Sequence, residues 1–175
     1  KECQNAKQII KSPINVNIRN LGIKVNSEYS DYGAFFTTDE SMMLFTSRRK
    51  GEDNNKISKF DNQYYEDVYQ TFRVDDKWTK AENVKKPLNS SSHDATAGLS
   101  NDGQEIFIYR NKKSKRGGDI YFSILKGDKW SRPKKLSKKI NSKYQETTAS
   151  LSYDGKSLYF VSDKPGGYGG RDIYR

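Results

Sequence analysis

The chain has 175 residues, with 32 Lys plus Arg against 22 Asp plus Glu and a formal net charge of +10. Hydrophobic residues make up only 33 % but aromatic residues reach 13 %, which argues against a disordered chain and favours many short strands with aromatic side chains on pleated surfaces. No apolar run is long enough for a membrane helix, and the positive charge permits anionic partners without choosing among them.

The N-terminal stretch predicts two short elements. Residues 1–12 suggest a helical lead-in, and residues 17–25 suggest a strand. The single Cys3 can form no internal disulfide and has no companion residues for a zinc site. We therefore expect a free thiol at the edge of a domain.

Three segments in tandem then share one sequence pattern. With Asn26, Asn89 and Asn141 in register, they align without a gap as NSEYSDYGAFFTTDESMMLFTS, NSSSHDATAGLSNDGQEIFIYR and NSKYQETTASLSYDGKSLYFVS. The period is 63 residues between the first two asparagines and 52 between the last two, and the 11 extra residues lie in the polar stretch GEDNNKISKFDNQ. A second matching set recurs further along, at 67–69, 119–121 and 172–174. Two matched sets indicate a true internal repeat.

Each unit resolves into four predicted strands. The first ends in a turn, and Asp102-Gly103 and Asp154-Gly155 are strong hairpin signals because glycine tolerates a positive φ. The first unit has Asp39-Glu40 there, so we expect its turn to be built differently. The second strand is an apolar run of the kind buried on both faces, and the third starts at the Asp-Val-Tyr or Asp-Ile-Tyr set. The fourth opens with a tryptophan and runs over 78–84 or 130–136.

Strands that repeat in fours about every 50 residues predict an all-β fold. The predicted architecture is a β-propeller of four-stranded antiparallel blades, here about three blades of an incomplete ring. The predicted units are 1–25, a lead-in and orphan outer strand of another blade; 26–88, a blade with the 11-residue insertion; 89–140, a blade; and 141–175, a partial blade of three strands. Because propellers have about 4–8 blades, we expect the chain to be part of a longer protein.

The repeat resembles the TolB-like family of WD-type propeller repeats, in SNDGQEIFIYR and SYDGKSLYFVSDKPGGYGGRDIY. The Trp strand that runs into Ile-Asn-Ser-Lys-Tyr-Gln-Glu at 140–146 is similar to a subset found in envelope proteins of the Bacteroidetes group. In that subset the propeller commonly precedes an OmpA-like domain that holds peptidoglycan, and some members serve type IX secretion and gliding. The resemblance implies a periplasmic, outer-membrane-associated scaffold that binds envelope proteins and, through flanking domains, peptidoglycan.

Chain direction sorts the loops onto two faces. The turn face carries the Asp-Gly hairpins and the turns between third and fourth strands. The loop face gathers the connections between blades and the loops from second to third strands. Since the loop face has the longer and more varied loops, we expect binding there. The candidate residues are Tyr29, Asp31, His93, Asp94, Arg110, Tyr144, Glu146 and Arg171.

Three of these candidates form a recurring acidic set. Asp31, Asp94 and Glu146 each stand five residues after the repeated asparagine and would circle the mouth of a channel. One hypothesis is a ring that binds a cation or a polar ligand. The hypothesis we favour is a turn carboxylate that accepts backbone N–H groups. His93 has no obvious chemical partner in the sequence, so we expect an ordinary loop residue.

We expect no catalytic residue, no metal site and no cofactor. The sialidase box S-x-D-x-G-x-x-W is not matched, because Gly103 and Gly155 directly follow the aspartates, and no G-x-S-x-G occurs. The predicted function is a non-catalytic protein- or cell-wall-binding scaffold module, with no nucleic acid partner and no transmembrane segment. The alternatives are a glycan- or peptidoglycan-binding propeller and, less favoured, a propeller glycosidase, which needs two carboxylates about 5–9.5 Å apart.

Overall fold

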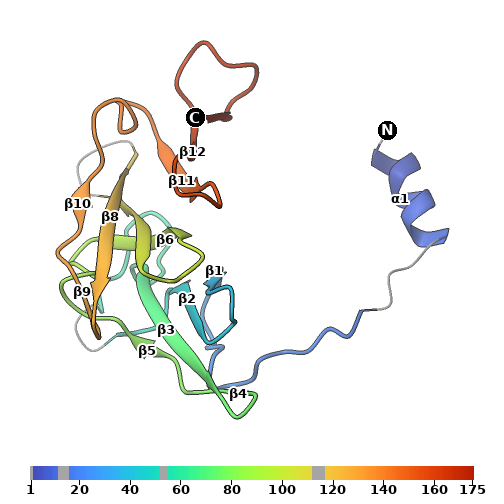
Figure 1. Cartoon of the computed structure of the whole chain (residues 1–175), viewed down its shortest axis with the longest axis vertical. Helices are drawn as coiled ribbons and strands as arrows, with labels where there is room; N and C mark the ends of the chain where they lie inside the picture. The colour runs from blue at the N-terminus through green and yellow to red at the C-terminus, as the bar shows by residue number, and fades with distance from the viewer. Residues whose placement is uncertain (1, 12–15, 52–54, 112–116) are drawn as a thin grey trace.

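The computed structural model describes residues 2–11, 16–51, 55–111 and 117–175. In this part of the chain, a helix α1 (Glu2–Lys11) precedes three antiparallel sheets, as Figure 1 shows. The all-β fold predicted from the sequence is confirmed, and so is the N-terminal helix. The first sheet contains β1 (Asp31–Phe36), β2 (Met42–Ser47), β3 (Asp67–Val74), β4 (Lys77–Trp78) and β5 (Glu82–Asn83). The second contains β6 (His93–Leu99), β7 (Glu105–Asn111), β8 (Asp119–Lys126), β9 (Lys129–Trp130) and β10 (Lys134–Lys135), and the third β11 (Glu146–Leu151), β12 (Leu158–Ser162) and β13 (Asp172–Tyr174).

Each sheet runs up and down in chain order, but the fourth strand differs from the expectation. In place of one strand, two short pieces flank a break, and both pair with the third strand. At the break in the first sheet, the Thr79 hydroxyl accepts the Phe72 N–H (3.1 Å) and the Thr79 carbonyl accepts the Thr71 hydroxyl (2.8 Å). Ser131 does the same in the second sheet, with Ile124 N–H (2.9 Å). The strand is broken because a side-chain oxygen replaces a backbone carbonyl in the ladder.

The apolar core lies between successive blades. Leu44 of β2 and Val68 of β3 are fully buried on the side that faces the second sheet. They pack in one cluster with Ile106 and Ile108 of β7. Because side chains alternate along a strand, each second strand has a forward face toward the next blade and a back face toward the previous one.

The same arrangement recurs one blade further on. Phe107 and Ile120 stand in the repeat positions of Leu44 and Val68, and they pack with Phe160 of β12. In the third sheet the equivalent residues are Tyr159 and Ile173, which are 41 % and 75 % exposed. The forward face of a blade is therefore buried where another blade follows it in the described structure, and open where none does.

The repeated asparagine connects one blade to the next. Asn89 is buried, accepts the Val68 N–H (2.9 Å) and donates to the Val68 carbonyl (2.9 Å). Asn141 makes the same pair of bonds with Ile120, at 2.7 and 2.8 Å. An amide side chain offers one donor and one acceptor side by side, which matches a backbone N–H and C=O of the third strand. This geometry explains why an asparagine recurs at this position.

The hairpin turn of the first blade corrects our expectation. Glu40 has φ +54°, close to the +71° of Gly103 and +68° of Gly155, so the first turn has the same left-handed residue as the others. Thr37 Oγ1 donates to Asp39 (2.6 Å) just as Ser100 donates to its aspartate (2.6 Å). The turn is built in the same way, and the glutamate adopts a strained conformation to achieve it.

The N-terminal segment also departs from the expectation. Residues 16–25 form no strand, and Gly22 instead begins a turn in which its carbonyl accepts the N–H groups of Val25 and Asn26. Val25 is buried in the core of the first sheet, and the Lys24 carbonyl accepts the Ala81 N–H (2.8 Å). A strand needs a continuous partner strand, and this segment makes only single contacts with the first sheet. Parts of two predicted loops, 52–54 and 112–116, lie outside the described residues.

Candidate binding face

The loop face is formed where the first and third strands of each sheet begin and the second strand ends. All eight residues predicted from the sequence lie on it or at the strand ends that border it. They fall into three groups: the three carboxylates with Arg110, the single His93, and three residues that remain accessible to solvent.

The three carboxylates of the predicted ring all bond a serine four positions earlier. In each case the carboxylate accepts both the backbone N–H and the hydroxyl of that serine. The pairs are Ser27 with Asp31 (2.7 and 2.9 Å), Ser90 with Asp94 (2.6 and 2.6 Å) and Ser142 with Glu146 (3.1 and 2.7 Å). These are the turn contacts of the hypothesis we favoured. Asp94 and Glu146 are fully buried, so their charge is directed into the protein.

Cations satisfy two of these carboxylates. Arg49 forms an ion pair with Asp31 (2.9 Å), and Arg110 forms one with Asp94. Burial alone would raise the pKa of Asp31, but hydrogen bonds from Ser47, Ser27 and Arg49 hold it below its ordinary value. Burial raises the pKa of Asp94, although Arg110 opposes the shift. In the third blade a neutral group takes this place, because the Ser162 hydroxyl donates to Glu146 (2.8 Å).

A cation covers a tyrosine of the third strand in each described blade, and in the first two blades it is the arginine that pairs with the carboxylate. The distances from the charged group to the ring centre are 4.6 Å for Arg49 and Tyr69, 5.0 Å for Arg110 and Tyr121, and 3.7 Å for Lys164 and Tyr174. The arginines also donate to the equivalent backbone carbonyls of Val25 (2.7 Å) and Leu88 (2.6 Å). Arg110 is thus committed to internal contacts, with an exposed side-chain fraction of only 11 %. It stabilises the blade instead of facing a partner.

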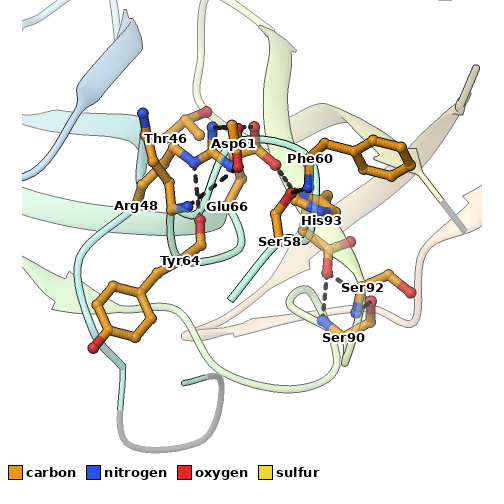
Figure 2. A network of polar contacts seen from close by, with 12 residues as sticks. Thr46, Arg48, Ser58, Phe60, Asp61, Tyr64, Glu66, Ser90, Ser92 and His93 are labelled. Atoms are coloured by element: carbon orange, nitrogen blue, oxygen red, sulfur yellow. Dashed lines mark hydrogen bonds and ion pairs between the residues drawn. The ribbon is translucent and has the colours of Figure 1, made fainter. Parts of the chain in front are cut away.

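His93 has a chemical partner that sequence spacing did not reveal. Its Nδ1 contacts a carboxylate oxygen of Glu66, and its ring stacks on Tyr65 at a centroid distance of 3.9 Å. The other carboxylate oxygen of Glu66 accepts the Tyr32 hydroxyl (2.9 Å). Although burial would raise the pKa of Glu66, its contacts with His93, Tyr32 and Arg48 hold it below the ordinary value. Figure 2 shows His93 and Glu66 within this network of polar contacts.

Arg48 connects the same network to the 11-residue insertion. Its Nε donates to the Tyr64 carbonyl (2.8 Å) and its Nη1 forms an ion pair with Asp61 (2.7 Å), while the side chain is only 11 % exposed. The insertion folds as a small hairpin in which Ile57 bridges Tyr64. The polar network therefore binds the insertion to the first and second blades.

Three predicted residues remain accessible. Tyr29 is 39 % exposed, meets Tyr64 edge-on at 5.5 Å, and lines an open hollow of about 690 Å³. Arg171 is exposed and donates to the Gln145 side chain (2.9 Å). Tyr144 is half-buried, with Lys143 over its ring at 5.3 Å. These side chains give the loop face an aromatic and basic character.

Sequence reasoning missed Phe60, which with Tyr168 (107 % exposed) is one of the two most exposed aromatic residues of this face. Phe60 stands at the tip of the insertion hairpin with an exposed fraction of 101 %, and Ile57 beside it is 51 % exposed. A large apolar residue in a polar stretch was the available signal, since the flanking sequence gives it nothing to pack against. Among the described residues, no three His, Cys, Asp or Glu side chains gather as they would around a metal ion.

Within the residues the structure describes, no helix is long and apolar enough to cross a membrane. No protein-family model and no curated protein sequence matches the chain. Its fold is similar to that of TolB from Acinetobacter baumannii, with 15 % identity, a TM-score of 0.56, and coverage of 86 % of this chain and 30 % of that one. A putative TolB from Agrobacterium tumefaciens also matches, with 15 % identity, a TM-score of 0.45, and coverage of 84 % and 58 %. The likeness to the first structure supports a propeller fold, and this chain spans less than a third of that protein's length.

Proposed function

We propose that the chain is a non-catalytic, protein-binding propeller module of a periplasmic, outer-membrane-associated scaffold, with the loop face as its contact surface. The observation that carries this proposal is the division of roles on that face. The recurring carboxylates and their cations serve the blades themselves, whereas aromatic side chains point outward. Exposed aromatic residues on loops held by a rigid sheet are typical of protein contact surfaces.

The chemistry of the face gives little support to an enzyme. His93 and Glu66 are in contact, but among the described residues no serine, threonine or cysteine side chain bonds either of them. A nucleophile within hydrogen-bond reach of its base is the usual signature of covalent catalysis. Asp31, Asp94 and Glu146 are bound to serines and cations, which leaves them poorly suited to act on a sugar.

The wider setting follows from the sequence resemblance. We place the module in an envelope protein of the Bacteroidetes type, with an OmpA-like domain as the link to peptidoglycan and with type IX secretion or gliding as the process served. In this proposal the propeller binds an envelope protein, and any contact with the cell wall is made by a flanking domain.

Photo-cross-linking tests the proposal. Benzoylphenylalanine would replace Tyr29 or Tyr144 on the loop face, and Tyr153 (93 % exposed) on the turn face as the control, in the protein expressed in its own cells. We expect a defined protein adduct from positions 29 and 144 and none from 153. Adducts from all three positions, or from none, would reject the loop face as the contact surface. Sedimentation of the isolated propeller with purified peptidoglycan would favour the glycan-binding alternative.

A further inference from the structure

The insertion of the first blade is a separate structural feature that the repeat does not require. It adds 11 residues between the second and third strands, where the other blades have shorter loops. The segment 55–66, which holds the described part of the insertion and leads into the third strand, forms a hairpin that presents Phe60 to solvent. In Figure 2 the ring of Phe60 points away from the polar network behind it.

The hairpin is ordered by its own hydrogen bonds. The Ser58 N–H donates to the Gln63 carbonyl (2.8 Å), and the Asn62 N–H donates to the Ser58 carbonyl (3.0 Å). Asn62 has φ +55°, the left-handed conformation that asparagine tolerates better than most residues. The buried Ser58 hydroxyl accepts the Phe60 N–H (3.3 Å), which fixes the backbone at the tip.

Five contacts with the blades then fix the hairpin as a unit. Arg48 binds the far side of the hairpin at the Tyr64 carbonyl and its turn at Asp61. Lys56 reaches the Ser91 carbonyl (3.2 Å) in the connection to the second blade. His93 contacts Glu66 and stacks on Tyr65 at the base of the insertion. A side chain presented on a segment already ordered loses little conformational entropy on binding, so its burial contributes more fully to affinity.

The charges around the tip indicate the chemistry of a partner. Asp61 is neutralised by Arg48, and the Glu66 carboxylate is occupied by His93 and Tyr32. Lys59, next to Phe60, is exposed and has no ion pair within the part of the chain that the structure describes. The tip therefore presents one apolar ring beside one positive charge, on a chain of net charge +10.

We infer that the 55–66 hairpin is the principal contact element of the loop face, and that Phe60 enters an apolar pocket with an acidic rim on a partner protein. This inference rests on the proposed function and names the residues that perform it. A buried aromatic residue surrounded by weaker polar contacts is the usual form of an interface hot spot. The acidic rim would pair with Lys59 and accelerate association with a basic protein.

Benzoylphenylalanine at position 60 tests the inference, with the same probe at position 153 as the control on the opposite face. We expect position 60 to give the same protein adduct as position 29, and position 153 to give none. With the captured protein purified, Phe60→Ala should raise Kd by about tenfold to a hundredfold, as expected when one phenylalanine side chain is no longer buried in the interface. Tyr153→Ala should leave Kd unchanged. Lys59→Glu should lower the association rate at low salt and have little effect at high salt.

Two outcomes would overturn the inference and leave the proposed function standing. One is an adduct from positions 29 and 144 but not from 60. The other is an adduct at 60 whose purified partner binds Phe60→Ala as tightly as the unaltered chain. Since Phe60 makes no buried contact, thermal unfolding of the variant should match that of the unaltered chain, so a loss of binding would not reflect misfolding. An adduct with glycan in place of protein would overturn both the inference and the proposed function.

Discussion

Replacing Asn89 by alanine is expected to weaken the connection between the first two blades and so to lower the free energy of unfolding. The Asn89 amide is buried and makes two bonds of 2.9 Å with the backbone of Val68, near the start of β3. Alanine removes both bonds; the Val68 carbonyl still accepts the Val84 N–H (3.1 Å), but the buried Val68 N–H loses its Asn89 acceptor. One net hydrogen bond contributes about 1 kcal/mol, and an unsatisfied buried group costs about 1–3 kcal/mol. We therefore expect a loss of about 2–4 kcal/mol in the free energy of unfolding.

Urea denaturation followed by circular dichroism would measure this loss, and thermal unfolding should show a decrease of about 5–15 °C for a chain of this size. Asn26→Ala is the matched control. Asn26 occupies the same repeat position, but among the described residues its side chain bonds only Asn20, at an exposed site (3.0 Å). We expect that variant to lose less than about 1 kcal/mol. If Asn89→Ala and Asn26→Ala proved equally mild, the asparagine would not be a connection between blades and our account of the repeat would fail.

Three further changes test other parts of the structure. Glu40→Gly should raise the free energy of unfolding in urea by about 0.5–1 kcal/mol, because glycine relieves a left-handed conformation. Gly155→Ala should lower the free energy of unfolding by about 1 kcal/mol, because Gly155 has φ +68° although the space around the added carbon is open. Arg110→Ala should cost about 3–5 kcal/mol in the same assay, because Asp94 would become a buried carboxylate without its cation. Hydrogen bonds from Thr37 and Ser41 lower the pKa of Asp39 from 3.8 to about 2, so its stabilising effect is present above pH 3.8 and lost as pH falls through 2. Asp39→Asn should remove that part of the acid dependence of the melting temperature, and an unchanged dependence would contradict the assignment.

The fold could be predicted from the sequence because the repeated residues specify the strands, the turns and the connections between blades. The asparagine, the turn aspartate and the apolar second strand each perform one local task, and those tasks recur at a fixed spacing. The first hairpin turn was misjudged because the preference for glycine is only a weak guide where local side-chain hydrogen bonds hold the turn. Glu40 lacks the freedom of glycine, yet the bonds from Thr37 and Ser41 to Asp39 form the same turn as in the other blades.

The binding face was less predictable, because its contacts join residues far apart in sequence. Glu66 and His93 are 27 residues apart, and Glu66 follows an insertion that has no counterpart in the other blades. Register was also misleading for the cations. The alignment places Arg110 opposite Ser47, but Arg49 makes the equivalent contacts, because a long flexible side chain can reach the same tyrosine face from two positions further along.

The division between frame and surface follows from these contacts. A carboxylate at the start of a first strand needs hydrogen-bond donors. A neighbouring serine provides them in each described blade, together with an arginine in the first two blades and Ser162 in the third. Once those needs are met within the blade, the connecting loops are free to vary in length and sequence without loss of the sheet. Within the described residues, the first blade uses this freedom for a hairpin, and the network of Arg48, Glu66 and His93 gives that hairpin a fixed position. The repeat therefore allows a fixed, exposed phenylalanine but does not require one. We expect this of a contact site that is held by a rigid scaffold.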